Sequence, residues 1–246
     1  MIRVNYFLCS LPRSGNTILG SLINQSKNVK LSSNSIIPEI IYRLLLLKDD
    51  QLFKNFPDHN SFDNIIKNIF DNYYKDWKAD YIITRGTWGT TGNLNSLKFI
   101  IKQPKFIILY RPVLECVASF IQIEKPKNIE SRCHELLSED GIVGKSLISI
   151  KNIISQEDYI KINYNDFIAN PQNEINKIFQ YLKTEFFEID LNNIKQFSVN
   201  GTYYDDDALP FNLHTIKTKW TELYKNNIKD CLPISIINEY KNIDIL

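Results

Sequence analysis

A short segment near the start of the chain has the residue types of an anion-binding loop. The segment Ser10-Leu11-Pro12-Arg13-Ser14-Gly15-Asn16-Thr17 lies between a β-prone run at residues 3 to 9 and apolar residues with helical spacing at 16 to 24. A strand, a loop and a helix in this order place backbone N–H groups and the positive end of a helix dipole around one point. The sequence therefore predicts a phosphate or sulfonate site at this loop.

The loop departs from the pattern G-x-x-x-x-G-K-[ST] of P-loop NTPases at a position that carries charge. Gly15 and Thr17 keep the second glycine and the hydroxyl, but Asn16 replaces the lysine that bridges the β and γ phosphates. A positive charge returns at Arg13, whose guanidinium can pair with two oxygens of a phosphate or sulfonate. A P-loop nucleoside or nucleotide kinase with a degenerate loop is one alternative, and an inactive nucleotide-binding module is another.

Three segments of the chain resemble one enzyme family. Leu11 to Thr17 resembles the 5′-phosphosulfate loop of the P-loop sulfotransferases, in their bacterial or viral form, which use 3′-phosphoadenosine-5′-phosphosulfate (PAPS) as donor. Phe106 to Ser119 resembles the family's 3′-phosphate motif, although Pro112 stands where the family more often has Asp, and Ile162 to Pro171 resembles a later strand and turn. The resemblance implies a transfer of the sulfuryl group from PAPS to an acceptor hydroxyl. The donor-binding residues that it implies are Arg13, Ser14, Gly15, Asn16, Thr17, Arg111 and Ser119.

We expect the donor site to work without a metal ion. A sulfuryl group carries less charge than a phosphoryl group, so backbone N–H groups, the hydroxyls of Ser14 and Thr17 and the Arg13 guanidinium can stabilise it during transfer.

The catalytic candidates are Arg13, Arg85, Glu39 and His214. Arg85 ends the predicted strand at 81 to 84, where a parallel sheet binds ligands, and it contacts either the sulfonate and acceptor or a structural ion-pair partner. Glu39 resembles the general base of the protein-tyrosine and carbohydrate branches, with helix N-terminal charge as the alternative role. His214 lies in a segment that resembles a late basic stretch of such enzymes. His59 and His134 are weaker candidates for the base.

The elements that must position these residues alternate along the chain. β-prone runs at 3 to 9, 81 to 84, 105 to 110 and 159 to 164 are separated by segments with helical periodicity, which predicts an α/β fold of three layers, P-loop-like, with a central parallel sheet flanked by helices. We expect a single domain over residues 1–246. The predicted helices are 36 to 47, 63 to 77, 96 to 102, 113 to 123, 129 to 154 and 173 to 182, and a surface loop at 199 to 212 holds the solvated triplet Asp205-Asp206-Asp207.

Composition limits the partners. With 29 Lys plus Arg against 28 Asp plus Glu the net charge is +1, so we expect no nucleic-acid partner. The four cysteines have no disulfide or zinc spacing, and no apolar stretch is long enough for an anchor or leader, so a cytoplasmic protein without a membrane partner is expected. The acceptor is a small-molecule alcohol, a carbohydrate or a peptide tyrosine. The oligomeric state is not predicted.

Overall fold

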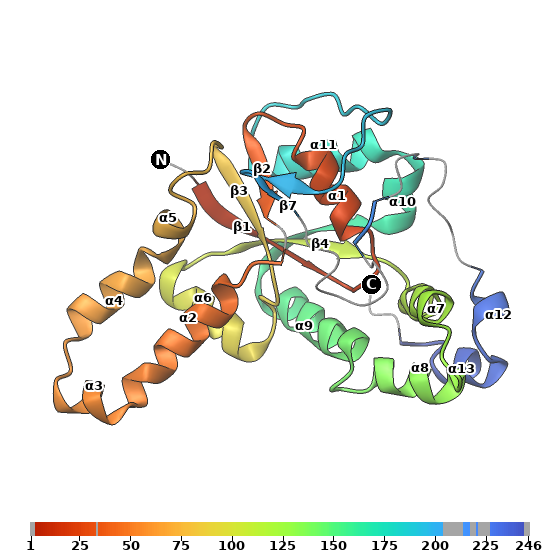
Figure 1. Ribbon diagram of the computed structural model, residues 1–246, viewed down its shortest axis with the longest axis horizontal. Helices are drawn as coiled ribbons and strands as arrows, with labels where there is room; N and C mark the ends of the chain where they lie inside the picture. Colours follow the sequence, from red (N-terminus) through yellow and green to blue (C-terminus); the bar gives the residue numbers. More distant parts are fainter. Residues whose placement is uncertain (1–2, 33, 204–213, 217–219, 221–226, 244–246) are drawn as a thin grey trace.

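The computed structural model describes residues 3–32, 34–203, 214–216, 220 and 227–243. Its centre is a five-stranded parallel sheet with the strand order β2-β3-β1-β4-β5 (Figure 1). Helices cover both faces of the sheet, which confirms the predicted three-layer α/β fold. The strands are β1 (Arg3–Ser10), β2 (Val29–Ser32), β3 (Tyr81–Arg85), β4 (Lys105–Tyr110) and β5 (Asp158–Asn163).

The sheet is buried on both faces because successive strand residues point to opposite sides and both sides are apolar. In β1, Phe7 packs in the same cluster as Trp88 on one face, whereas Leu8 packs in the same cluster as Leu19 on the other. The first cluster includes residues of α2 (Ile37–Leu46), α6 (Thr91–Ile100), α7 (Val113–Glu124), α8 (Ile129–Leu137) and α9 (Ile142–Gln156), and the second includes residues of α1 (Asn16–Ile23), α10 (Tyr164–Ala169) and α11 (Pro171–Leu182).

The edge strand β2 was not predicted. Its four residues contain only two apolar side chains, Val29 and Leu31, and it pairs with β3 alone, so the sequence offers no apolar run to detect. Lys30 points to the other side and donates from Nζ to the carbonyl oxygens of Asn24 at 2.8 Å and Ser26 at 2.6 Å. Lys30 is thus satisfied by the turn that precedes the strand, and Ser32 Oγ accepts from the backbone N–H of Arg85 at 3.2 Å.

The predicted long helix at 129 to 154 is wrong, because the chain forms the two helices α8 and α9. The break needs Gly141, where an added Cβ would lie 2.1 Å from the carbonyl oxygen of Glu135 and 2.4 Å from that of Leu136. The predicted helix at 63 to 77 is likewise divided, into α4 (His59–Lys67) and α5 (Ile69–Tyr73).

The remaining elements are short. The predicted loop at 199 to 212 begins instead as a hairpin of β6 (Ser198–Val199) and β7 (Thr202–Tyr203), whose turn uses Asn200 and Gly201 at φ 49° and 75°. The Asp205-Asp206-Asp207 triplet lies outside the described residues. The other helices are η1 (Leu47–Asp49), α3 (Gln51–Asn55), α12 (Ile228–Cys231) and α13 (Ile234–Glu239). All four cysteines are free thiols, and three of them are buried, as expected.

Candidate active site

The loop between β1 and α1 has an unusual backbone. Arg13 and Gly15 both adopt positive φ angles, 61° and 87°, and Gly15 is the N-cap of α1. A Cβ atom at Gly15 would lie 2.8 Å from Cε2 of Tyr164, so this position requires glycine for its conformation and for its close contact with a ring. The loop therefore ends against the side chain of an element more than 140 residues away in the sequence.

Two side chains of the loop stabilise it through hydrogen bonds within the loop itself. Ser14 donates its hydroxyl to the carbonyl oxygen of Leu11 at 2.6 Å, and Asn16 Nδ2 donates to the same oxygen at 3.2 Å. Both side chains are buried. Asn16 thus places an amide, turned back into the loop, where a P-loop NTPase has its lysine. The Thr17 hydroxyl is half-buried in the first turn of α1, and no described residue forms a hydrogen bond with it.

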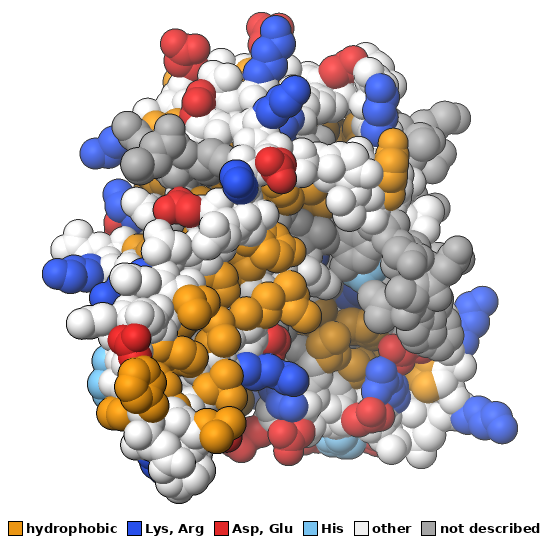
Figure 2. Space-filling model, turned by 60° about the vertical axis from the view of Figure 1, so that its left-hand side comes forward, with side chains coloured by type: hydrophobic (Ala, Val, Ile, Leu, Met, Phe, Trp, Pro, Cys, Tyr) orange, Lys and Arg blue, Asp and Glu red, His pale blue; other side chains and the backbone are white. Residues whose placement is uncertain are grey.

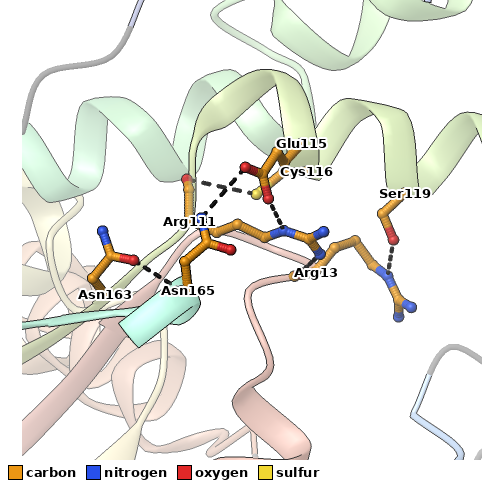
Figure 3. Close-up of polar contacts among 7 residues, drawn as sticks. All are labelled: Arg13, Arg111, Glu115, Cys116, Ser119, Asn163 and Asn165. Carbon is orange, nitrogen blue, oxygen red and sulfur yellow. Dashed lines mark hydrogen bonds and ion pairs between the residues drawn. The ribbon is translucent and has the colours of Figure 1, made fainter. Parts of the chain in front are cut away.

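The register of the sheet brings Arg111 beside this loop. Ser10 at the end of β1 pairs with Leu109, and Tyr110 at the end of β4 pairs with Asn163. Arg111 follows β4 directly, and its side chain is only 4% exposed. It donates from Nη1 to the Arg13 carbonyl oxygen at 3.0 Å and from Nε to Glu115 Oε2 at 3.1 Å (Figure 3). Arg111 therefore holds the loop at Arg13, a residue other than glycine with a positive φ.

Arg13, Arg111 and Ser119 converge on one side of the loop. The Arg13 side chain extends to α7, where its Nε donates to Ser119 Oγ at 3.3 Å (Figure 3). Nη2 of Arg111 is buried, and no described residue accepts a hydrogen bond from it. A buried guanidinium nitrogen without an acceptor costs free energy unless an anion or water meets it. Two guanidinium groups, a hydroxyl and the N-terminus of α1 thus form a site suited to an oxyanion.

The predicted acceptor residues lie at the same edge of the sheet. Leu8 of β1 pairs with Arg85, the last residue of β3. The Arg85 carbonyl oxygen accepts from the backbone N–H of Ser35 at 2.9 Å, which ties the chain leading into α2 to the end of β3. Glu39 lies in the first turn of α2 and is exposed, and its carboxylate makes no hydrogen bond or ion pair with the described residues.

A scan against protein-family models decides the family. Residues 6–188 match the model described as the sulfotransferase family, which is well over half of the chain. The chain belongs to the sulfotransferase family. The matched range contains the loop, the Arg111 and Ser119 segment, and the strand and turn that carry Tyr164.

Several solved sulfotransferase structures have a fold similar to that of this sulfotransferase. It is similar to a sulfotransferase domain from the curacin biosynthetic pathway, at 15% identity and a TM-score of 0.58, over 99% of this chain and 92% of that one. A sulfotransferase domain from the Synechococcus PCC 7002 olefin synthase matches at 15% identity and a TM-score of 0.57, over 100% and 96% of the two chains. A sulfotransferase from Alicyclobacillus acidocaldarius matches at 12% identity and a TM-score of 0.52, over 77% and 84%. A search of the curated proteins found no match.

Sequence reasoning missed three residues of the sulfotransferase site. Glu115 pairs with Arg111, and its i,i+4 spacing after a strand-end arginine was the available signal. Tyr164 places its ring centroid 4.4 Å from Arg111 Cζ, and burial raises the pKa of its hydroxyl, so the ring stays neutral beside the cation. Asn165 donates from Nδ2 to Glu115 Oε1 at 3.4 Å. The segment with Tyr164 and Asn165 was treated as structural only.

The three histidines have different surroundings. The His214 carbonyl oxygen accepts from Gln196 Nε2 at 3.1 Å, and its assignment as an alternative base stays a prediction. His59 is exposed at the start of α4, and its ring packs against Phe53. His134 lies on α8, with Nδ1 at 3.0 Å from the Tyr240 hydroxyl. Trp88 and Tyr74 are fully buried core residues.

Exposed apolar side chains follow the outer side of α2. Ile36, Leu46 and Leu47 are 57%, 50% and 47% exposed, and Glu39 lies on the same helix. Figure 2 shows hydrophobic side chains gathered on this part of the molecule beside a hollow in its surface. We call Ile36, Leu46 and Leu47 the α2 apolar face.

A second concave region lies at the other end of α1. A polar pocket of about 460 Å³ is lined by residues that include Ser21, Asn24, Glu188 and Lys195. It adjoins the C-terminal half of α1 rather than the loop, so it is separate from the candidate active site.

Two kinds of feature are absent from the described residues, a bilayer-spanning helix and a metal-holding group of side chains. None of the helices in these ranges is long and apolar enough to span a bilayer. No group of three or more His, Cys, Asp or Glu side chains in the same ranges is arranged to hold a metal ion.

Proposed function

We propose that this sulfotransferase moves the sulfuryl group of PAPS to an acceptor hydroxyl. The observation that carries the proposal is the convergence of Arg13, Arg111 and Ser119 at the N-terminus of α1, with Arg111 Nη2 buried and without an acceptor among the described residues. A donor with phosphates at both the 3′ and 5′ positions needs two anion-binding regions. The α1 loop and the Arg111 and Ser119 pair provide two that are adjacent.

The residues fit the two ends of such a donor in different ways. Arg111 Nη2 and the Ser119 hydroxyl suit the 3′-phosphate, because one donor is buried and the other is a small hydroxyl that Arg13 already contacts. The N-terminus of α1, with Gly15 allowing close approach and Thr17 in its first turn, suits the 5′-phosphosulfate. Asn16 supplies no cation there, which disfavours the kinase alternative.

The chain's own residues supply the chemistry around the donor, whose contribution is an activated sulfuryl group on a nucleotide leaving group. Charge grows on the leaving oxygen and on the equatorial oxygens during in-line displacement, and the loop N–H groups and the Arg13 guanidinium stabilise it. Glu39 accepts the proton of the acceptor hydroxyl as general base. Arg85 contacts the sulfonate or the acceptor from the end of β3.

The α2 apolar face favours an acceptor with an apolar part. The proposed base lies on α2, and Ile36 precedes this helix while Leu46 and Leu47 lie at its other end, so an alcohol bound at Glu39 has exposed apolar side chains along the same helix. Small-molecule alcohols, carbohydrates and peptide tyrosines remain the classes to test. The enzyme is proposed to act in the cytoplasm without a metal ion.

Calorimetry with adenosine 3′,5′-bisphosphate and 5′-AMP tests the donor site. The bisphosphate should bind at least about ten-fold more tightly, because Arg111 and Ser119 would bind the additional phosphate. Equal affinities would remove the proposal. Turnover of radiolabelled PAPS over a panel of alcohols, sugars and tyrosine peptides then separates an enzyme from an inactive nucleotide-binding module, and turnover should persist in a chelator. Strict dependence on Mg²⁺ would favour the kinase alternative.

A further inference from the structure

The ion pair of Arg111 and Glu115 has a third member. Glu115 accepts on Oε2 from Arg111 Nε at 3.1 Å, and on Oε1 it accepts from Asn165 Nδ2 at 3.4 Å (Figure 3). Asn165 is 50 residues further along the chain, in the first turn of α10. The carboxylate is therefore held between two elements, with one oxygen for each.

This arrangement decides which guanidinium nitrogen is left for a ligand. Nε of Arg111 is occupied by Glu115 and Nη1 by the Arg13 carbonyl, while Nη2 is buried and has no acceptor among the described residues. The guanidinium is planar and rigid, so fixing Nε and Nη1 fixes the direction of Nη2. The Tyr164 ring against the guanidinium restricts tilting of the plane.

The Glu115 side chain is the least constrained part of this arrangement. It is long, it starts in the first turn of α7, and it is 20% exposed, so it has rotamers in which it leaves Arg111 or turns toward a bound anion. The hydrogen bond from Asn165 removes those rotamers. Asn165 is itself fixed, because its backbone N–H donates to Asn163 Oδ1 at 2.8 Å and Asn163 pairs with Tyr110 across the sheet.

We propose that Asn165 is a positioning residue for the donor nucleotide: through Glu115 it orients the Arg111 guanidinium so that Nη2 meets the 3′-phosphate. The inference rests on the proposed function, since the 3′-phosphate is the anion assigned to Arg111. Asn165 itself touches neither the donor nor the reacting atoms. A neutral amide is required there, because a second carboxylate would repel Glu115.

The test is the affinity for adenosine 3′,5′-bisphosphate and for 5′-AMP, measured by calorimetry at pH 8. Asn165→Asp should weaken bisphosphate binding on the order of ten-fold, because it replaces a hydrogen bond to a charged group by a like-charge contact, and should weaken 5′-AMP binding less. The matched control is Asn128→Asp. This change makes the same substitution at the N-cap of α8, where the side-chain oxygen accepts from Ser131 N and an aspartate caps as well.

A double variant gives a readout that a structural role alone would not move. Combining Asn165→Asp with Glu115→Gln exchanges the amide and the carboxylate, so the new glutamine can accept from Arg111 Nε and donate to the new aspartate. Bisphosphate affinity should return to within about three-fold of wild type, whereas Glu115→Gln alone should stay weaker because a neutral amide then faces Arg111 and no carboxylate remains beside it.

The outcomes separate the inference from the function on which it rests. If the wild-type protein does not prefer the bisphosphate over 5′-AMP, the proposed function fails. If it does, and Asn165→Asp binds both nucleotides as wild type does, the positioning role is overturned. If Asn165→Asp does not fold, the double variant decides, because affinity no better than that of Glu115→Gln alone contradicts the proposal.

Discussion

The proposed donor side and the proposed acceptor side of this site are built in opposite ways. Around the α1 loop the key groups are buried and joined to one another, as the contacts of Arg111 with Arg13 and Glu115 show. Around the start of α2, Glu39 is exposed, and so are Ile36 just before the helix and Leu46 at its other end. A shared donor needs a fixed site, whereas acceptor choice depends on open surface that differs among enzymes with one fold. The four predictions below test this difference.

The largest effect is expected from Glu39→Gln, on the open side. The substitution keeps the shape of the side chain and removes its basicity, so turnover should fall by a factor on the order of 10² to 10⁴ while donor affinity and thermal stability stay at wild-type values. Steady-state kinetics with labelled donor, beside calorimetry with adenosine 3′,5′-bisphosphate, measures both. Near-normal turnover would transfer the role of base to His214, and His214→Asn would then be the variant to examine.

Arg13→Ala tests the buried side of the site, around the α1 loop. We propose that its guanidinium faces the charge that grows on the transferred group, so the chemical step should slow on the order of 10²-fold, with a smaller loss in donor affinity. Arg13→Lys should recover only part of the rate, because an ammonium lacks the rigid, planar pair of N–H donors that a guanidinium presents to two oxygens. Single-turnover measurements separate the chemical step from donor binding. Wild-type turnover in Arg13→Ala would mean that the loop does not contact the sulfonate.

Gly15→Ala measures how tightly the α1 loop is packed. The new Cβ would meet the Tyr164 ring at 2.8 Å and would also be forced into a positive φ, so the free energy of unfolding should fall by about 2 kcal/mol or more. Gly201→Ala is the matched control, since Gly201 has φ 75° but no atom within 4 Å of an added Cβ. Urea unfolding of both variants gives the difference. Equal losses would show that the Tyr164 contact adds nothing.

The smallest effect is expected from Leu46→Ser on the α2 apolar face. Leu46 is 50% exposed, so its replacement should leave stability and donor affinity unchanged and raise the KM of an apolar acceptor by about three-fold. The comparison is made with acceptors that differ in alkyl chain length. An unchanged KM across that series would separate the apolar face from acceptor binding.

The loop side was the more predictable half because its residues fall in two short segments, each at the end of a strand. The loop could be assigned from the order of strand, loop and helix, and Arg111 and Ser119 were implied by the family resemblance, with both segments at the edge where the carboxyl ends of parallel strands meet. The hydrogen-bond partners of these side chains could not be assigned from the sequence. Ser119 was grouped with Arg111, whereas the structure has it accepting from Arg13 Nε.

The rest depended on contacts that local pattern does not encode. The Asn165 to Glu115 hydrogen bond and the Tyr164 to Gly15 contact join segments about 50 and 150 residues apart, and both involve residue types common in solvated turns. The strand β2 lacked an apolar run, and the break between α8 and α9 depends on a close approach at Gly141. Placing the chain that leads into α2 beside Arg85 required the backbone hydrogen bond between Ser35 and Arg85.

The strand order also sets when the donor site can exist. Its loop follows the first strand of the sheet in chain order, but Arg111 lies 98 residues later than Arg13, and the corner that carries Tyr164 and Asn165 follows β5. A nascent chain that stops before β5 lacks the ring that supports Gly15 and the amide that holds Glu115. Because such distant segments close late in folding, the proposed nucleotide site is completed only after the chain of all five strands of the sheet has been made.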